Sequence, residues 1–262
     1  MVFRYYPVAL QFVATRPIAV PPQCAANLFR GALGALLRNT AREHYQEMFT
    51  PHPAEGPSGL RDRPRPFVFR TADLDGKSIL PGEVFTVRMN VFEPRAIEPF
   101  VEAWKHYQLA QLQSVSGTSP QEIPLLGSTR ASHVQVRFVT PLELKNEGRI
   151  VAAPSFDVLL KRIRDRVSAI SELYGHGPLD LDFRSFAERA ALVRMTRSAV
   201  QQVTLERTSR NTGQTHPLGG LIGEAEYEGE LGEFLPYLEV ARHSGVGRQT
   251  VWGKGEIHLG VS

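Results

Sequence analysis

The sequence predicts an α+β fold in which two similar units follow one another. Its 262 residues exceed what one small core needs and suit one large or two small domains. Some segments alternate between apolar and polar residues, as strands do, and others carry one apolar stripe, as helices do. They follow in the order strand, helix, strand, strand, helix, strand, and this order occurs twice. Hydrophobic residues make up 42% and charged residues 22% of the chain, which excludes a disordered, collagenous or coiled-coil protein.

The first unit opens with an apolar strand at 8–13. Two prolines at 21–22 then start a helix whose apolar residues keep helical spacing to residue 37. Gly31 and Gly34 each cost this helix about 1 kcal/mol relative to alanine, so we expect close packing or a ligand to compensate. The segment 50–66 holds five prolines and two glycines and is predicted to be a surface loop.

Two strands follow the loop, at 67–69 and 85–91. The second alternates between apolar and polar residues, which is typical of a half-buried strand. Pro94 starts a second helix that extends to Tyr107, and an alternating strand at 134–138 completes the unit. This is the order of a ferredoxin-like (RRM-like) fold, with both helices on one face of the sheet.

The second half repeats the order. We expect a strand or hairpin at 142–151, a helix at 155–174, strands at 200–207 and 218–227, a helix at 231–242 and a last strand at 257–259. Arg162, Arg164 and Arg166 lie off the apolar stripe of the long helix, so we interpret them first as a solvated face and second as a binding surface. We therefore predict tandem ferredoxin-like (RRM-like) domains at 1–140 and 141–262.

The composition also bears on location and partners. The single cysteine, Cys24, permits no internal disulfide, and neither a membrane-length apolar run nor a secretory signal is evident, so we expect a cytoplasmic protein without membrane contact. Arginine supplies 25 of the 30 basic residues. The segment from Arg184 to Arg210 contains six arginines and only two acidic residues. Such clustering favours a polyanionic partner, because guanidinium groups pair well with phosphates.

The segment 244–255 is the most informative. It holds four glycines with Arg248, Trp252 and Lys254, between a predicted helix and the last strand. Backbone N–H groups in such glycine-rich loops can bind anions, and the aromatic ring can stack on bases. The spacing does not fit a nucleotide P-loop or a dinucleotide fingerprint. The other interpretation is a tight turn that packs against a neighbouring domain.

Several segments together resemble one family. They are the helix Leu28–Arg38, the segments Tyr45–Phe49 and Pro64–Val68, the helix Phe156–Tyr174, the run Leu218–Gly223 and the glycine-rich loop. In this order the segments are similar to the pre-crRNA-processing endoribonucleases of the RAMP superfamily of CRISPR proteins. The resemblance implies tandem ferredoxin-like domains, which agrees with the pattern above.

The resemblance also implies a reaction. In that family the 2′-hydroxyl beside the scissile phosphate of CRISPR repeat RNA attacks it, leaving a 2′,3′-cyclic phosphate and a 5′-hydroxyl. Such a reaction needs a base, an acid and cations around the phosphorane, but no metal or other cofactor. The sequence shows no clear metal-binding motif.

The resemblance places a catalytic histidine at or after the first helix, where this chain has His44. Arg42 could then assist the phosphorane and Tyr45 could orient the nucleophile. His243, just before the glycine-rich loop, is the second candidate, as a base, a phosphate contact or a helix cap.

The residues that we expect to contact RNA share a basic side chain or a place in the glycine-rich loop. They are Arg30, Arg38, Arg194, Arg197, Arg207, Arg210, Gly245, Gly247, Arg248, Gln249, Gly253, Lys254 and Gly255. We expect repeat RNA or crRNA as the partner, transfer of the product to an interference complex as in some relatives, and a monomer or homodimer. The alternative is a non-catalytic crRNA-binding scaffold subunit of such a complex, which stays open because Ala35 stands where relatives often carry a helix histidine.

Overall fold

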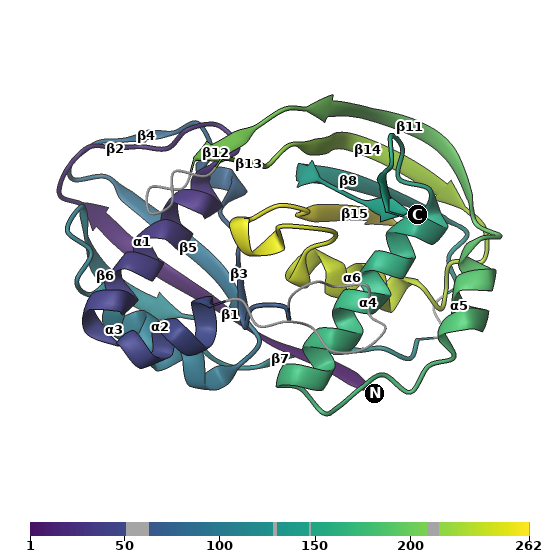
Figure 1. The fold of residues 1–262 in the computed structure, drawn as a ribbon, viewed down its shortest axis with the longest axis horizontal. Coiled ribbons are helices and arrows are strands. Elements are labelled where there is room, and N and C mark those ends of the chain that lie inside the picture. Colours follow the sequence, from purple (N-terminus) through teal and green to yellow (C-terminus); the bar gives the residue numbers. More distant parts are fainter. Residues whose placement is uncertain (51–62, 128–129, 147, 209–214, 262) are drawn as a thin grey trace.

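The computed structural model describes residues 1–50, 63–127, 130–146, 148–208 and 215–261 and shows two antiparallel sheets side by side, each with helices on one face (Figure 1). None of the helices in these ranges is long and apolar enough to span a bilayer.

The first sheet has the strand order β3-β5-β1-β6, and β7 pairs with the start of β1. The elements of this half, in chain order, are β1 (Val2–Ala14), β2 (Ile18–Ala19), α1 (Ala25–Thr40), α2 (Arg42–Phe49), β3 (Phe67–Phe69), β4 (Ser78–Ile79), β5 (Val84–Val91), α3 (Ile97–Trp104), β6 (Ala110–Ser116) and β7 (Gln121–Pro124). Short 3₁₀ turns lie at Ala72–Leu74 and Pro94–Ala96, and β2 and β4 form a separate ribbon.

The second sheet has the order β11-β14-β8-β15. Its half contains β8 (His133–Leu142), β9 (Lys145–Asn146), β10 (Arg149–Ile150), α4 (Phe156–Tyr174), α5 (Phe183–Ala190), β11 (Arg194–Val203), β12 (Glu206–Thr208), β13 (Thr215–Pro217), β14 (Gly220–Glu228), α6 (Leu235–Ser244), the 3₁₀ turn η3 (Thr250–Trp252) and β15 (Ile257–Val261). In both sheets the first and third strands of the unit are central and the second and fourth are outside. This is the ferredoxin-like arrangement, so the predicted tandem fold is confirmed.

One strand assignment from the sequence is wrong. The strand predicted at 134–138 belongs to β8, which pairs with β14 and β15 in the second sheet and not with the first. The fourth strand of the first sheet is β6, most of whose side chains are exposed or half-buried, so it has no clear apolar face in the sequence. The sheets thus change between β7 and β8, ahead of the expected boundary at residue 141.

Strand β1 contributes to both cores. Val8, Leu10 and Phe12 lie in the first core with the inner faces of α1 and β5. Phe3 and Tyr5, whose positions along the strand are odd and not even, lie in the second core with α4 and α6. Because successive side chains of a strand point to opposite faces, one strand can serve two neighbouring cores.

The C-terminal end of α6 joins the two halves. Its last three carbonyl groups each accept a hydrogen bond from a side chain of another element. Arg70, after β3, donates to the carbonyl of residue 242 at 3.2 Å, Asn90 of β5 donates to that of residue 243 at 2.9 Å, and Arg166 of α4 donates to that of residue 244 at 2.9 Å. These carbonyls have no partner within the helix, and cations are favoured at this end of the helix dipole.

The expectation for Arg166 is therefore wrong, since it is buried with 6% of its surface exposed. Burial, together with the nearby charge of Arg70, lowers the pKa of Arg166 to about 9, so the group stays charged at neutral pH. Arg162 and Arg164 also make internal bonds, to the backbone of residues 145 and 183.

Candidate functional site

One face of α1 connects the glycine-rich loop to α2. Ala26, Arg30, Gly34 and Arg38 follow one another at intervals of four residues and so share this face. A Cβ on Gly34 would lie 3.0 Å from Cε1 of Phe49, so glycine allows α2 to approach α1. The guanidinium of Arg38 lies over Tyr45, 5.2 Å from the ring centroid. This packing supplies the compensation expected for Gly34.

Arg30 lies at the middle of this face. Its guanidinium carbon is 5.2 Å from the ring centroid of Phe49 in α2 and 5.8 Å from that of Trp252 in η3. Arg30 therefore contacts aromatic rings from both halves of the chain.

The glycine-rich loop is built by close backbone packing. Gly245, Gly247, Gly253 and Gly255 all have φ between +69° and +79°, which is strained for other residues. A Cβ on Gly253 would lie 2.1 Å from that of Ala26, and a Cβ on Gly255 would lie 1.8 Å from the carbonyl oxygen of residue 246. The N–H groups of Gly245, Gly253 and Gly255 donate to the carbonyls of residues 241, 250 and 141. These N–H groups are thus used within the fold, and the geometry matches the tight-turn interpretation.

The polar residues of this loop are also held internally. Lys254 is buried, its Nζ donates to the carbonyl of Gln23 at 3.0 Å, and desolvation lowers the pKa of its ammonium group. Arg248 pairs with Glu143. Gln249 adopts a left-handed conformation at the start of η3. Of the two cations expected to face a phosphate, Arg248 is half-exposed and Lys254 is not.

Helix α2 carries the first catalytic candidates. Arg42 is exposed, His44 is half-exposed in the first turn of the helix, and Tyr45 stacks on Phe49 with ring centroids 5.4 Å apart. Tyr45 thus anchors α2, while His44 and Arg42 remain accessible. Arg30 and Arg38 of α1 pack on this helix through Phe49 and Tyr45, and α2 itself also carries the exposed acids Glu43 and Glu47.

His243, at the end of α6, is the centre of a second cluster. Its Nε2 lies 3.3 Å from the hydroxyl of Tyr5 and 3.3 Å from Oε1 of Glu239, and its ring stacks on Tyr5 with centroids 4.4 Å apart. The hydrogen bond with His243, followed by that from Arg242, lowers the pKa of Glu239 to about 2. Burial raises the pKa of Tyr5. Sequence reasoning missed Tyr5 and Glu239, although the spacing of 239 and 243 by one helical turn was visible.

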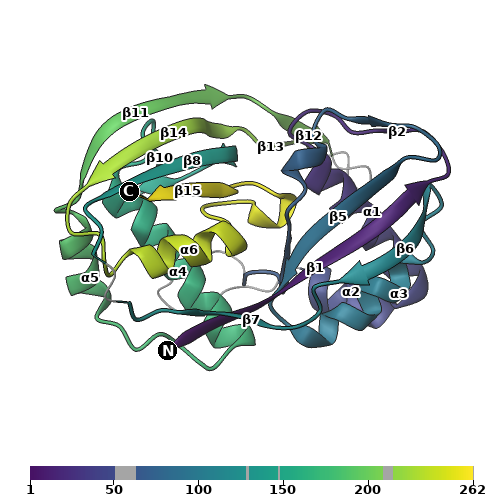
Figure 2. The ribbon, with the colours of Figure 1, turned by 180° about the vertical axis from the view of Figure 1, so that it is seen from behind.

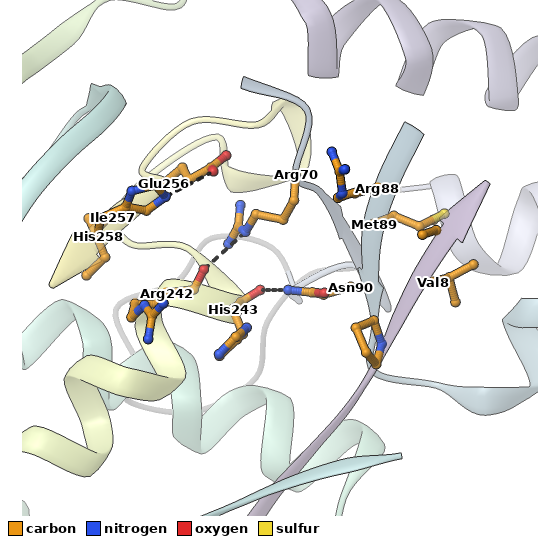
Figure 3. A pocket seen from close by; sticks show the side chains of 12 residues that line it. Val8, Arg70, Arg88, Met89, Asn90, Arg242, His243, Glu256, Ile257 and His258 are labelled. Atoms are coloured by element: carbon orange, nitrogen blue, oxygen red, sulfur yellow. Dashed lines mark hydrogen bonds and ion pairs between the residues drawn. The ribbon is translucent and has the colours of Figure 1, made fainter. Parts of the chain in front are cut away.

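A cavity of about 230 Å³ lies beside this cluster, between the two halves (Figure 3). Strands β1 and β5 form one wall, and the end of α6 with the start of β15 forms the other. Its polar lining consists of Arg70, Arg88, Asn90, Arg242, His243, Glu256 and His258. Arg88 pairs with Asp73 and Arg242 pairs with Glu239, so the charges of the wall are largely balanced.

His44 and His243 are not brought together. Helices α1 and α2 cover the face of the first sheet that carries Leu10, Val87 and Met89. Figures 1 and 2 show both helices on one side of this sheet. Arg88 and Asn90, which line the cavity beside His243, alternate with Val87 and Met89 along β5 and so project from its other face. The two histidines therefore belong to two separate sites.

The arginines of the basic segment lie at the edge strand β11. Arg194 and Arg197 are largely exposed and pair with acidic residues of β14, Glu228 for the first and Glu224 and Glu226 for the second. Arg207 belongs to β12, and Arg210 lies outside the described residues. Within the described ranges, no three His, Cys, Asp or Glu side chains are grouped so as to hold a metal ion.

Residues 136–257 match the family of the CRISPR-associated endoribonuclease Cas6, and residues 3–119 match a family described as an N-terminal domain. These matches lie on either side of the change of sheet. No curated protein matches the chain.

Solved structures resemble the whole chain. A Cas6 product complex has a TM-score of 0.62 at 19% identity over 97% of this chain and 99% of that one. Thermus thermophilus Cas6 has a TM-score of 0.60 at 18% identity over 99% of both chains. A RAMP protein binding different RNA substrates has a TM-score of 0.51 at 12% identity over 97% of this chain and 99% of that one. The family match over residues 136–257 and the fold shared with solved Cas6 structures over the whole chain both agree with the resemblance seen in the sequence: the second half matches the Cas6 endoribonuclease family, and the chain has the Cas6 fold.

Proposed function

We propose that this protein is an endoribonuclease that cleaves CRISPR repeat RNA without a metal ion and so matures crRNA. The 2′-hydroxyl beside the scissile phosphate attacks it, leaving a 2′,3′-cyclic phosphate and a 5′-hydroxyl. The match to an endoribonuclease family supports the nuclease activity, and solved Cas6 structures include complexes with product and with a substrate mimic.

The observation that carries the proposal is the surface formed by α1, α2 and the glycine-rich loop. Helix α2 carries the half-exposed His44 and the exposed Arg42, Arg38 of α1 packs on Tyr45 next to His44 in the chain, and Trp252 of the other half packs on Arg30 of the same helix α1. These contacts support the proposal. A histidine can accept the proton of the 2′-hydroxyl near neutral pH, and guanidinium groups stabilise the charge that develops on the phosphorane.

We propose one role for each of these residues. His44 acts as the base, Arg42 stabilises the phosphorane, and Tyr45 orients the nucleophile from its anchored place on α2. Three further arginines contact the RNA backbone when a phosphate replaces the carboxylate with which each is paired in the protein: Arg194, Arg197 and Arg248. His243, whose Nε2 already faces Glu239 and Tyr5, holds the two halves together and is not the base.

The test is a cleavage assay in excess EDTA on the repeat RNA of the host's CRISPR array, with and without a 2′-deoxy substitution at the mapped cut. We expect cleavage of the unmodified RNA only. His44→Ala should lower the rate by about 10²–10⁴-fold, the usual contribution of one acid–base group, and His243→Ala by much less. His176→Ala, at an exposed histidine after α4, is the matched control.

Two results would contradict the proposal. Cleavage that requires a divalent cation, or that continues on the deoxy substrate, would exclude the 2′-hydroxyl mechanism. Tight binding of the unmodified RNA without cleavage would identify the protein as an RNA-binding scaffold subunit of an interference complex.

A further inference from the structure

Arg30 stacks between aromatic rings from the two halves of the chain. Phe49 belongs to α2, the helix of His44, and Trp252 belongs to η3 within the glycine-rich loop. The guanidinium carbon lies 5.2 Å and 5.8 Å from the two ring centroids, within the range of a cation–π contact. No other residue of α1 has cation–π contacts with both halves among those described.

The residues one turn before and one turn after Arg30 on this face of α1 are in close contact with the glycine-rich loop and with α2, respectively. One turn before it, Ala26 faces Gly253, where a Cβ would be only 2.1 Å away. One turn after it, Gly34 faces Phe49, where a Cβ would be 3.0 Å from the ring. The loop and α2 therefore both rest on α1, and Arg30 occupies the place between them.

The chemistry of this contact suits arginine. A guanidinium group is planar and can stack on two rings at once, whereas an ammonium group is a compact and strongly hydrated charge. The two ring contacts engage the faces of the guanidinium, on which an RNA base would otherwise stack. Its position favours a role in holding the surface together over direct contact with RNA.

We propose that Arg30 is a positioning residue, which holds the glycine-rich loop against α2 so that the loop and His44 meet the same RNA. The inference rests on the proposed function for its catalytic consequence, and it replaces the direct RNA contact expected for Arg30 from the sequence. Loss of the guanidinium should misplace the loop relative to His44 while leaving the exposed arginines free to bind.

The experiment compares Arg30→Ala, Arg30→Lys and Trp252→Ala with the control Arg149→Ala, at an exposed arginine of β10. Three quantities are measured: amide hydrogen exchange of residues 250–255 without RNA, the dissociation constant for the repeat RNA, and the single-turnover cleavage rate at saturating RNA. Arg30→Met, which keeps the apolar stem, replaces Arg30→Ala if the latter unfolds.

We expect faster exchange of 250–255 in Arg30→Ala and no change in Arg149→Ala. The saturated cleavage rate should fall by about 10–100-fold, as a small misplacement of reacting groups does. The dissociation constant should change by no more than about threefold, because the exposed arginines that we propose to bind the RNA are unaltered. Arg30→Lys should recover part of the rate. The double variant of Arg30→Ala and Trp252→Ala should lose no more of the cleavage rate than Arg30→Ala alone, since the effects of two residues that act together are not additive.

Unchanged exchange of 250–255 in Arg30→Ala would overturn the inference. So would weaker RNA binding with a normal saturated rate, which would identify a direct RNA contact. If the wild-type protein fails to cleave the RNA, the proposed function fails, while the exchange data still decide whether Arg30 holds the loop.

Discussion

Glu239 shows how a single contact changes the ionisation of a residue. Its carboxylate accepts from His243 and Arg242 on the same helix, and these contacts lower its pKa from 4.5 to about 2 in spite of partial burial. A carboxyl group whose pKa is lower in the folded chain stabilises the fold above its ordinary pKa and loses this contribution as the pH falls. For Glu239 this loss occurs between about pH 4.5 and 2.

The first prediction concerns this pH dependence. Glu239→Gln removes the titrating group, so the free energy of unfolding of this variant should fall less than that of the wild type between about pH 4.5 and 2. Urea unfolding at several pH values in this window measures the difference. Equal pH dependence of the two proteins would show that Glu239 is not coupled to His243 in the way the geometry indicates.

At the scale of elements, the glycines of α1 and of the loop behave differently. Gly253 has φ +79° and touches Ala26 of α1. Gly31 lies within α1, and nothing in the described structure is within 4 Å of the position of its Cβ. The two positions therefore respond to the same substitution in opposite directions.

The second prediction is this contrast. Gly253→Ala should destabilise the protein by about 1–3 kcal/mol through backbone strain and overpacking against α1. Gly31→Ala should stabilise it by about 0.5–1 kcal/mol, because alanine loses less entropy in a helix. Urea unfolding of both variants provides the measurement. A stable Gly253→Ala protein with an unchanged midpoint would contradict the close contact between loop and α1.

The elements also show what the sequence can predict. Helices α1 and α4 and strand β5 were predictable because their apolar residues follow a regular period. Strand β6 was not, since its pairing with β1 leaves most of its side chains exposed and the period is lost. Within the site, His44 and the glycine-rich loop were predictable by resemblance. The contact of Arg30 with Trp252 joins residues far apart in the chain, and no local pattern indicates it.

At the scale of the whole molecule, the two halves meet at the end of α6. Asn90 is buried, and its side chain donates to the carbonyl of residue 243, whose helix belongs to the other half. A buried carbonyl that loses its hydrogen-bond donor is left desolvated without a partner, and this lowers the stability of the fold by about 1–3 kcal/mol.

The third prediction tests this contact. Asn90→Ala should lower the free energy of unfolding by about 1–3 kcal/mol, because the carbonyl of residue 243 loses its donor. Asn146→Ala, at an exposed asparagine of β9, should change it by less than about 0.5 kcal/mol. Urea unfolding gives both values. A similar small effect for the two variants would mean that water replaces Asn90 at the junction.

The shared strand β1 has a consequence for folding. Phe3 and Tyr5 of this strand, together with Val68 and Phe92, complete the core of the other half. A fragment that contained only the second half would lack these side chains, and its core would be open to water. The second half is therefore not an autonomous folding unit, and we expect it to unfold together with the first half in a single cooperative transition.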